Sequence, residues 1–105
     1  MDTQYLFNSK GTWIAYRKDK FVFDTHGVWI GWLPWDEEPD VLDVNGEYLG
    51  TVYNDNRLIH FDFRPYHGYP GTPGFPGYPG FPGSPGFIGA TTLPNGAHDI
   101  KILEH

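Results

Sequence analysis

The twelve residues Phe21-Val-Phe-Asp-Thr-His-Gly-Val-Trp-Ile-Gly-Trp32 have the pattern of a β-hairpin. Two runs rich in aromatic and β-branched residues flank a short polar turn that ends at Gly27. Such runs favour strands, and a turn glycine supplies a backbone conformation that other residues adopt only at a cost. The stretch therefore predicts two antiparallel strands joined by a tight turn.

Two further segments align with this one on their glycines. They are residues 5–16, with Gly11, and residues 40–51, with Gly46. In all three an aromatic residue stands two positions after the glycine, followed by an apolar and then a small residue; the aromatics are Trp13, Trp29 and Tyr48. Repeats of this spacing predict a β-meander in which each hairpin leans on its neighbours. No helical periodicity is visible, so the predicted fold is all-β.

Strand signals continue on both sides of a long Pro-Gly segment. Residues 57–63 alternate apolar and polar side chains as a strand does, and Asn95-Gly96 predicts a turn before a short C-terminal strand. If that last strand pairs back onto the sheet, the Pro-Gly segment is a long Ω-like insertion with both ends fixed.

Between Gly68 and Gly89 a glycine returns at every third position, and proline precedes six of these eight glycines. Proline excludes an α-helix or a central strand, which leaves polyproline II with three residues per turn. That geometry predicts one stripe of glycine, one of proline, and one that carries five aromatic residues. Because a glycine stripe admits another backbone and an aromatic stripe favours burial, we expect assembly contacts here. The expected contact residues are Gly71, Gly74, Gly77, Gly80, Gly83, Phe75, Tyr78 and Phe81.

The charge distribution divides the chain, since residues 65–98 contain no Asp, Glu, Lys or Arg. We therefore predict a hairpin-repeat module over 1–64, a Gly-X-Pro tract over 65–90, and a C-terminal turn and strand over 91–102. Residues 103–105 look like the remnant of a histidine tag.

Composition limits the function further. The net charge of −6 argues against nucleic acid and anionic membrane surfaces as partners. There is no cysteine, no signal-peptide pattern and no apolar run that could span a bilayer, so we expect a cytoplasmic protein.

The repeat motifs resemble a known family. Phe-Asp-x-x-Gly-x-Trp-Ile-Gly-Trp at 23–32 and Asn-Gly-Glu-Tyr-Leu-Gly at 45–50 are similar to the small bacterial family of four-fold β-flower proteins. The resemblance covers residues 5–62 and implies a β-rich module of hairpin repeats, often followed by Pro-rich triplets. It implies no activity. A fourth repeat is not legible, because the position nineteen residues after Gly46 holds Pro65.

The tryptophans Trp13, Trp29 and Trp32 have two readings. They also resemble the aromatics of choline-binding cell-wall repeats, which would make them a cage for a small ligand or carbohydrate. Those proteins are secreted, however, and large aromatics usually fill a core, so we favour a core role.

Sites for metals and catalysis are weakly indicated. His60 and Asp62 share one strand face and could bind a divalent metal together with His67 or His98. An acidic loop carries Asp36, Glu37, Glu38 and Asp40 but lacks the ligand spacing of an EF-hand. We read both as ordinary solvated groups and expect no metal or cofactor. Without a nucleophile motif, we also expect no enzyme.

The sequence thus favours a structural module that forms homo-oligomers through the Gly-X-Pro tract. The alternatives are an interaction module whose Pro-rich tract is read by a partner domain, and a small-ligand-binding aromatic hairpin repeat.

Overall fold

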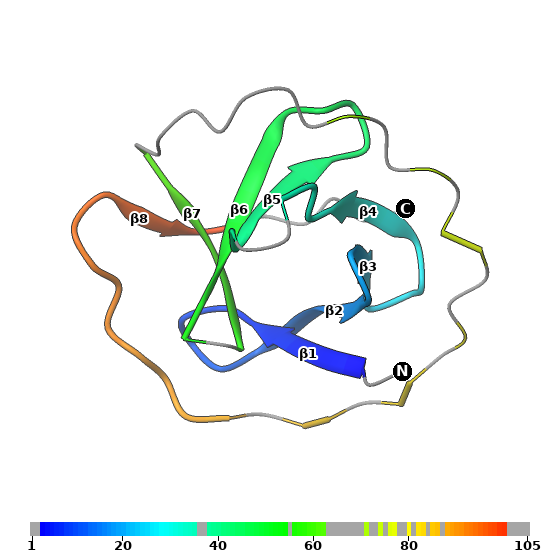
Figure 1. Ribbon diagram of the computed structural model, residues 1–105. Coiled ribbons are helices and arrows are strands. Elements are labelled where there is room, and N and C mark those ends of the chain that lie inside the picture. The colour runs from blue at the N-terminus through cyan, green and yellow to red at the C-terminus, as the bar shows by residue number, and fades with distance from the viewer. Residues whose placement is uncertain are drawn as a thin grey trace.

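The computed structural model describes residues 3–35, 38–54, 56–62, 71, 74, 76, 77, 80, 82, 83, 85, 86 and 88–100. Within these residues the chain forms eight strands and no helix, which confirms the all-β prediction (Figure 1). The strands are β1 (Thr3–Phe7), β2 (Trp13–Lys18), β3 (Phe21–Asp24), β4 (Trp29–Trp32), β5 (Asp40–Asp43), β6 (Tyr48–Tyr53), β7 (Arg57–Phe61) and β8 (Ala97–Asp99).

The first seven strands form a closed barrel. Each strand pairs antiparallel with the next one along the chain, and β1 returns to pair with β7 at Phe7 and Arg57. An up-and-down meander with an odd number of strands brings its first and last strands together in parallel, as observed for β1 and β7. The short β8 pairs with the other half of β7, from Ile59 to Phe61, and confirms the predicted C-terminal strand.

The first three hairpins, β1–β2, β3–β4 and β5–β6, have turns of the same kind. In the β3–β4 hairpin the Asp24 side chain accepts hydrogen bonds from the backbone N–H groups of His26 (2.8 Å) and Val28 (3.0 Å). Asn8 and Asp43 accept the corresponding pairs in the other two hairpins. The turn glycines have φ of +88° (Gly11), +83° (Gly27) and +89° (Gly46), the left-handed region that glycine occupies at no steric cost.

The fourth hairpin is β7–β8. Asp62 follows Phe61 as Asp24 follows Phe23, and its backbone N–H donates to the carbonyl of Gly96 (2.7 Å). Phe61 pairs with Ala97 just as Phe23 pairs with Trp29. Gly96 (φ +79°) therefore takes the place of Val28, one residue after the turn glycine, and the Gly-X-Pro tract belongs to the loop of this hairpin.

The barrel interior is aliphatic. One cluster of buried side chains fills it: Leu6, Ala15, Val22, Leu33, Val41 and Leu58. Strand neighbours of these residues point to the opposite face, yet Phe7, Tyr16 and Phe23 on that outer face are at most 4% exposed. The outer face of β1–β3 is thus aromatic, and it is covered.

The tract is not polyproline II at six of its seven described glycines. Their φ values run from +71° to +87° (Gly71, Gly74, Gly77, Gly80, Gly83 and Gly86), whereas polyproline II needs about −75°. A positive φ at a glycine after proline is what the third position of a type II turn requires. The prediction of polyproline II is wrong at these six glycines, because proline fixes its own φ but leaves the φ of the next glycine free.

At its described residues the tract curves round the barrel. We call its described residues (71, 74, 76, 77, 80, 82, 83, 85, 86 and 88–91) the girdle. Figure 1 shows the girdle as a yellow-to-orange path outside the strands. A straight tract would reach roughly 60 Å, but the molecule measures only 35 × 34 × 26 Å. The predicted Ω-like insertion is confirmed.

Candidate functional site

Four aromatic side chains form a continuous row on the outer face of β1–β3. The ring of Trp13 lies 5.8 Å from that of Tyr5, edge to face, and 6.4 Å from that of Tyr16. Tyr16 in turn stacks on Phe23 at 5.4 Å. We call these four residues the aromatic row.

The girdle lies on this row. The Tyr5 hydroxyl donates to the carbonyl of Pro82, and the Tyr16 hydroxyl donates to the carbonyl of Gly80, both at 2.9 Å. Tyr16 is fully buried although it points away from the aliphatic core. The aromatic row therefore provides two hydroxyl donors that hold two carbonyls of one Pro-Gly chain.

The end of the girdle is fixed to the first hairpin turn. Ile88 N–H donates to the carbonyl of Gly11 (3.1 Å), and Thr91 N–H donates to that of Ser9 (2.8 Å). A side chain at Gly11 would collide with the carbonyl oxygen of Ile88, since its Cβ would lie 1.9 Å away. The close approach and the positive φ both require glycine at this turn.

Arg57 joins the barrel closure to the girdle. Its guanidinium donates to the carbonyls of Asn8 (2.9 Å) and Gly89, and the residue is only 8% exposed. Beside it, Asp99 accepts hydrogen bonds from the backbone N–H (2.7 Å) and hydroxyl (2.6 Å) of Ser9. One buried cation thus connects β7, the first turn and the girdle.

Four hairpins arranged round one barrel, the fourth with a Pro-Gly loop, place the chain among known proteins. A family model described as 4-fold beta flower protein matches residues 1–89. The chain belongs to this family. The match extends beyond the hairpins to include β7 and most of the girdle. No curated protein and no solved structure matches the chain.

The tryptophans of this β-flower chain lie in different surroundings. Trp13 and Trp29 are half-buried and occupy equivalent places in two hairpins, where each Nε1 donates to a backbone carbonyl two residues on (2.7 and 2.8 Å). Trp29 packs edge-on against Phe21 at 6.1 Å. Trp32 is 4% exposed, with the Lys20 amino group 5.8 Å from its ring centre.

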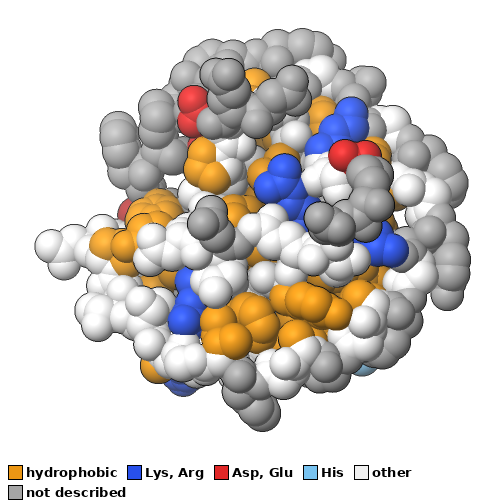
Figure 2. Space-filling model, turned by 60° about the horizontal axis from the view of Figure 1, so that its bottom comes forward, with side chains coloured by type: hydrophobic (Ala, Val, Ile, Leu, Met, Phe, Trp, Pro, Cys, Tyr) orange, Lys and Arg blue, Asp and Glu red, His pale blue; other side chains and the backbone are white. Residues whose placement is uncertain are grey.

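A pocket that the sequence did not indicate opens beside the β2–β3 turn. It holds about 240 Å³ and is lined by Arg17, Asp19, Lys20, Leu33 and Trp35. Arg17 is already engaged, because its Nε donates to the carbonyl of Asp19 (2.6 Å). Ligand pockets usually measure about 300–1,000 Å³, so this one is small. Figure 2 shows lysine and arginine side chains among hydrophobic ones on the face that it brings forward.

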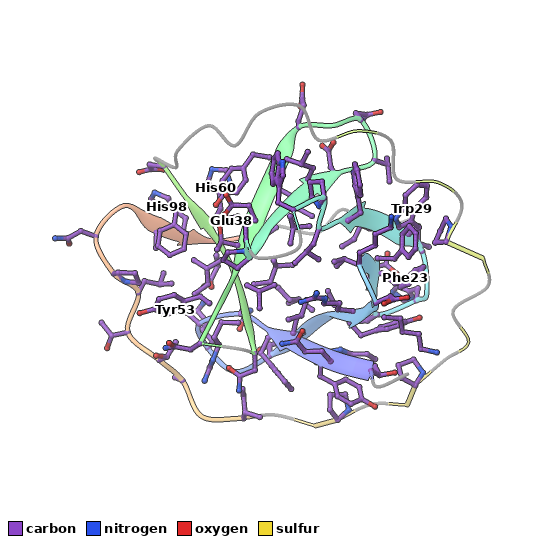
Figure 3. The ribbon with its side chains drawn as sticks, viewed as in Figure 1. Phe23, Trp29, Glu38, Tyr53, His60 and His98 are labelled. Carbon is purple, nitrogen blue, oxygen red and sulfur yellow. The ribbon has the colours of Figure 1, made fainter. Side chains whose placement is uncertain are left out.

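The histidines and the acidic loop do not form a metal centre within the described residues, where no three His, Cys, Asp or Glu side chains are placed to hold an ion. His98 lies opposite His60 across β7–β8, and its Nε2 contacts the Asp62 carboxylate at 2.9 Å (Figure 3). Both partners of this contact are 61% exposed. The Nδ1 atom of His60 instead lies 3.2 Å from the carbonyl oxygen of Leu49.

Several predicted site residues lie outside the described part of the chain. These are Phe75, Tyr78, Phe81, His67, Asp36 and Glu37. Of the acidic loop, Glu38 is exposed (Figure 3), whereas Asp40 is buried and accepts a hydrogen bond from Thr51 (2.8 Å). Asp40 therefore has a structural partner.

Proposed function

We propose that this β-flower chain is a non-enzymatic self-association module and that copies meet through the girdle. The observation that carries the proposal is the open space beside its glycines. Among the described residues, no atom other than those of the glycine and its two chain neighbours lies within 4 Å of the position that a Cβ would take at Gly71, Gly74, Gly77 or Gly83. The backbone there is open to the approach of another chain.

The charge distribution also favours the girdle as the contact surface. The chain carries a net charge of −6, so two copies repel each other over most of their surfaces. Residues 65–98 contain no Asp, Glu, Lys or Arg, so this repulsion is weakest between girdles. A partner domain that reads Pro-rich segments is the alternative. We expect the module to act in the cytoplasm without a cofactor.

The test is the mass of the full chain in solution. Light scattering at micromolar concentration is expected to give a multiple of 12.0 kDa. Gly77→Asp should reduce that mass toward 12.0 kDa, because it places a charge on the girdle of every copy. A monomer at all micromolar concentrations would contradict the proposal.

Gly46→Asp is the matched control. Gly46 also has a positive φ and open space at its Cβ position, but it lies in the third hairpin turn. Both variants therefore carry the same added charge at a glycine of positive φ. If the two change the mass equally, the girdle is not the contact surface.

A further inference from the structure

We propose that the aromatic row is a binding site for a Pro-Gly strand, and that the girdle of a second copy occupies it in the assembled protein. The choice of occupant rests on the proposed self-association. In this exchange, two copies trade girdles and each aromatic row is filled by the partner's chain.

The recognition chemistry is on the row itself. The hydroxyls of Tyr5 and Tyr16 bind the carbonyls of Pro82 and Gly80, which are two residues apart along the girdle. The Trp13 ring contacts both tyrosine rings and completes an apolar floor. Because proline has no N–H, a Pro-Gly strand offers mainly carbonyl acceptors, and hydroxyl donors on an aromatic surface suit them.

Burial indicates that the row needs an occupant. Tyr16 is 0% exposed, and its outward hydroxyl donates to the girdle carbonyl of Gly80. An empty row would expose its rings and return both hydroxyls to water, at a cost in apolar surface. Any Pro-Gly strand in the same position would restore the burial, whether it comes from the same copy or from another.

A second copy is the occupant that the chain itself supplies. Every copy carries both the row and the matching strand, and reciprocal exchange reproduces each contact in a symmetric pair at low cost. The loop between Asp62 and Gly96 is long, and longer loops add little closure entropy. In the single chain the tether acts as an effective concentration on the order of millimolar. We therefore expect exchange to increase when the chain folds at high protein concentration.

Cross-linking between isotopically labelled copies tests the exchange. The chain has no cysteine, so Lys10→Cys with Ala90→Cys introduces the only two thiols. Both positions are exposed, and they lie between the two backbone hydrogen bonds that join the girdle to the first turn. Light and ¹⁵N-labelled copies are refolded together at high concentration, treated with a short bismaleimide, and analysed by mass spectrometry.

Exchange predicts that cross-links join a light copy to a heavy copy, and that their share rises with refolding concentration. Oligomers whose cross-links all lie within one copy would overturn the exchange and leave the self-association standing. Mixed cross-links without a stable micromolar oligomer would support the exchange and contradict the proposed function. Monomers with cross-links only within one copy would overturn both.

The recognition step has its own readout in the full chain. Tyr5→Phe with Tyr16→Phe removes both hydroxyl donors and keeps the rings, and the exchange rates of the Ile88 and Thr91 amides are followed by NMR. Loss of two hydrogen bonds, at about fivefold each, should raise these rates about 25-fold. Tyr53→Phe, whose ring packs on Phe61 away from the row, is the control. Unchanged rates in the double variant would overturn the role of the hydroxyls.

Discussion

The first three hairpins and the fourth connect their two strands in different ways. In the third, Asp43 binds the N–H groups of Asn45 and Glu47 and closes the turn with local contacts alone. In the fourth, Asp62 and Gly96 keep the backbone hydrogen bond next to the turn, but the described residues of the loop between them lie along the outside of the barrel. The difference shows that the barrel needs the paired strands of each hairpin and does not need a short turn between them. A long loop must then be held by contacts with distant residues.

The largest expected loss of stability comes from the variant that removes the contacts between Arg57 and the long loop. Arg57→Ala removes a buried cation and leaves the carbonyls of Asn8 and Gly89 without their donor. Hydrogen bonds to charged groups contribute about 1.5–3 kcal/mol each, so unfolding should become easier by about 3 kcal/mol or more. Urea unfolding measures this. Arg17→Ala, at a half-buried arginine, is the control and should cost less than half as much; equal losses would contradict the special role of Arg57.

The next effect concerns the contact between a local hairpin and its neighbour. A Cβ at Gly31 would lie 2.4 Å from the Leu42 carbonyl oxygen, so Gly31→Ala should destabilise by about 2 kcal/mol through overpacking. At Gly50 the nearest atom is Cδ1 of Ile100, the end of a flexible side chain beside the fourth hairpin. Gly50→Ala should therefore cost less in thermal melts. The reverse order would show that the fourth hairpin is packed as tightly as the others.

A third comparison tests the aspartates at the start of the turns. Asp24→Ala leaves the N–H groups of His26 and Val28 without an acceptor and should cost about 1–2 kcal/mol. Asp62 is exposed and contacts His98, and exposed pairs contribute about 0.2–1 kcal/mol, so Asp62→Ala should cost less. Chemical denaturation of the two variants separates them. Equal costs would mean that the fourth turn depends on its aspartate as the second does.

The smallest effect compares one glycine from each kind of turn. Gly46 and Gly77 have φ of +89° and +74°, and both have free space for a methyl group. Gly46→Ala should cost about 1 kcal/mol, because alanine is strained at this φ and the short turn holds it there. Gly77→Ala in the long girdle should cost less, since the loop can shift. Melting temperatures check the pair, and a greater loss at Gly77 would show that the girdle is the more rigid region.

The same contrast explains what the sequence could predict. The three local hairpins follow from nearby residues, because strand runs, turn and glycine lie within one short segment. The fourth is not visible when the repeats are aligned on glycine, because the position nineteen residues after Gly46 holds Pro65. Aligned instead on the aspartates, the chain shows Asp24, Asp43 and Asp62 at an interval of nineteen residues. That signal was present.

Long-range contacts left no such signal. The partners of Arg57 are backbone carbonyls at Asn8 and Gly89, and a carbonyl has no residue type by which a sequence reveals it. The tyrosine hydroxyls likewise bind carbonyls at Gly80 and Pro82. The path of the girdle depends on these contacts and on glycine torsions that proline does not fix, so composition alone does not determine it.

The position of the girdle late in the chain has a consequence for synthesis. β1 through β7 leave the ribosome first and contain every strand of the barrel, including the β1–β7 closure. The girdle and β8 follow, and at about 5–20 residues per second they need roughly 2–8 s to emerge. During that interval the outward hydroxyls of Tyr5 and Tyr16 lack the girdle carbonyls that they bind in the folded chain. We expect neighbouring nascent copies on one messenger to meet in this state.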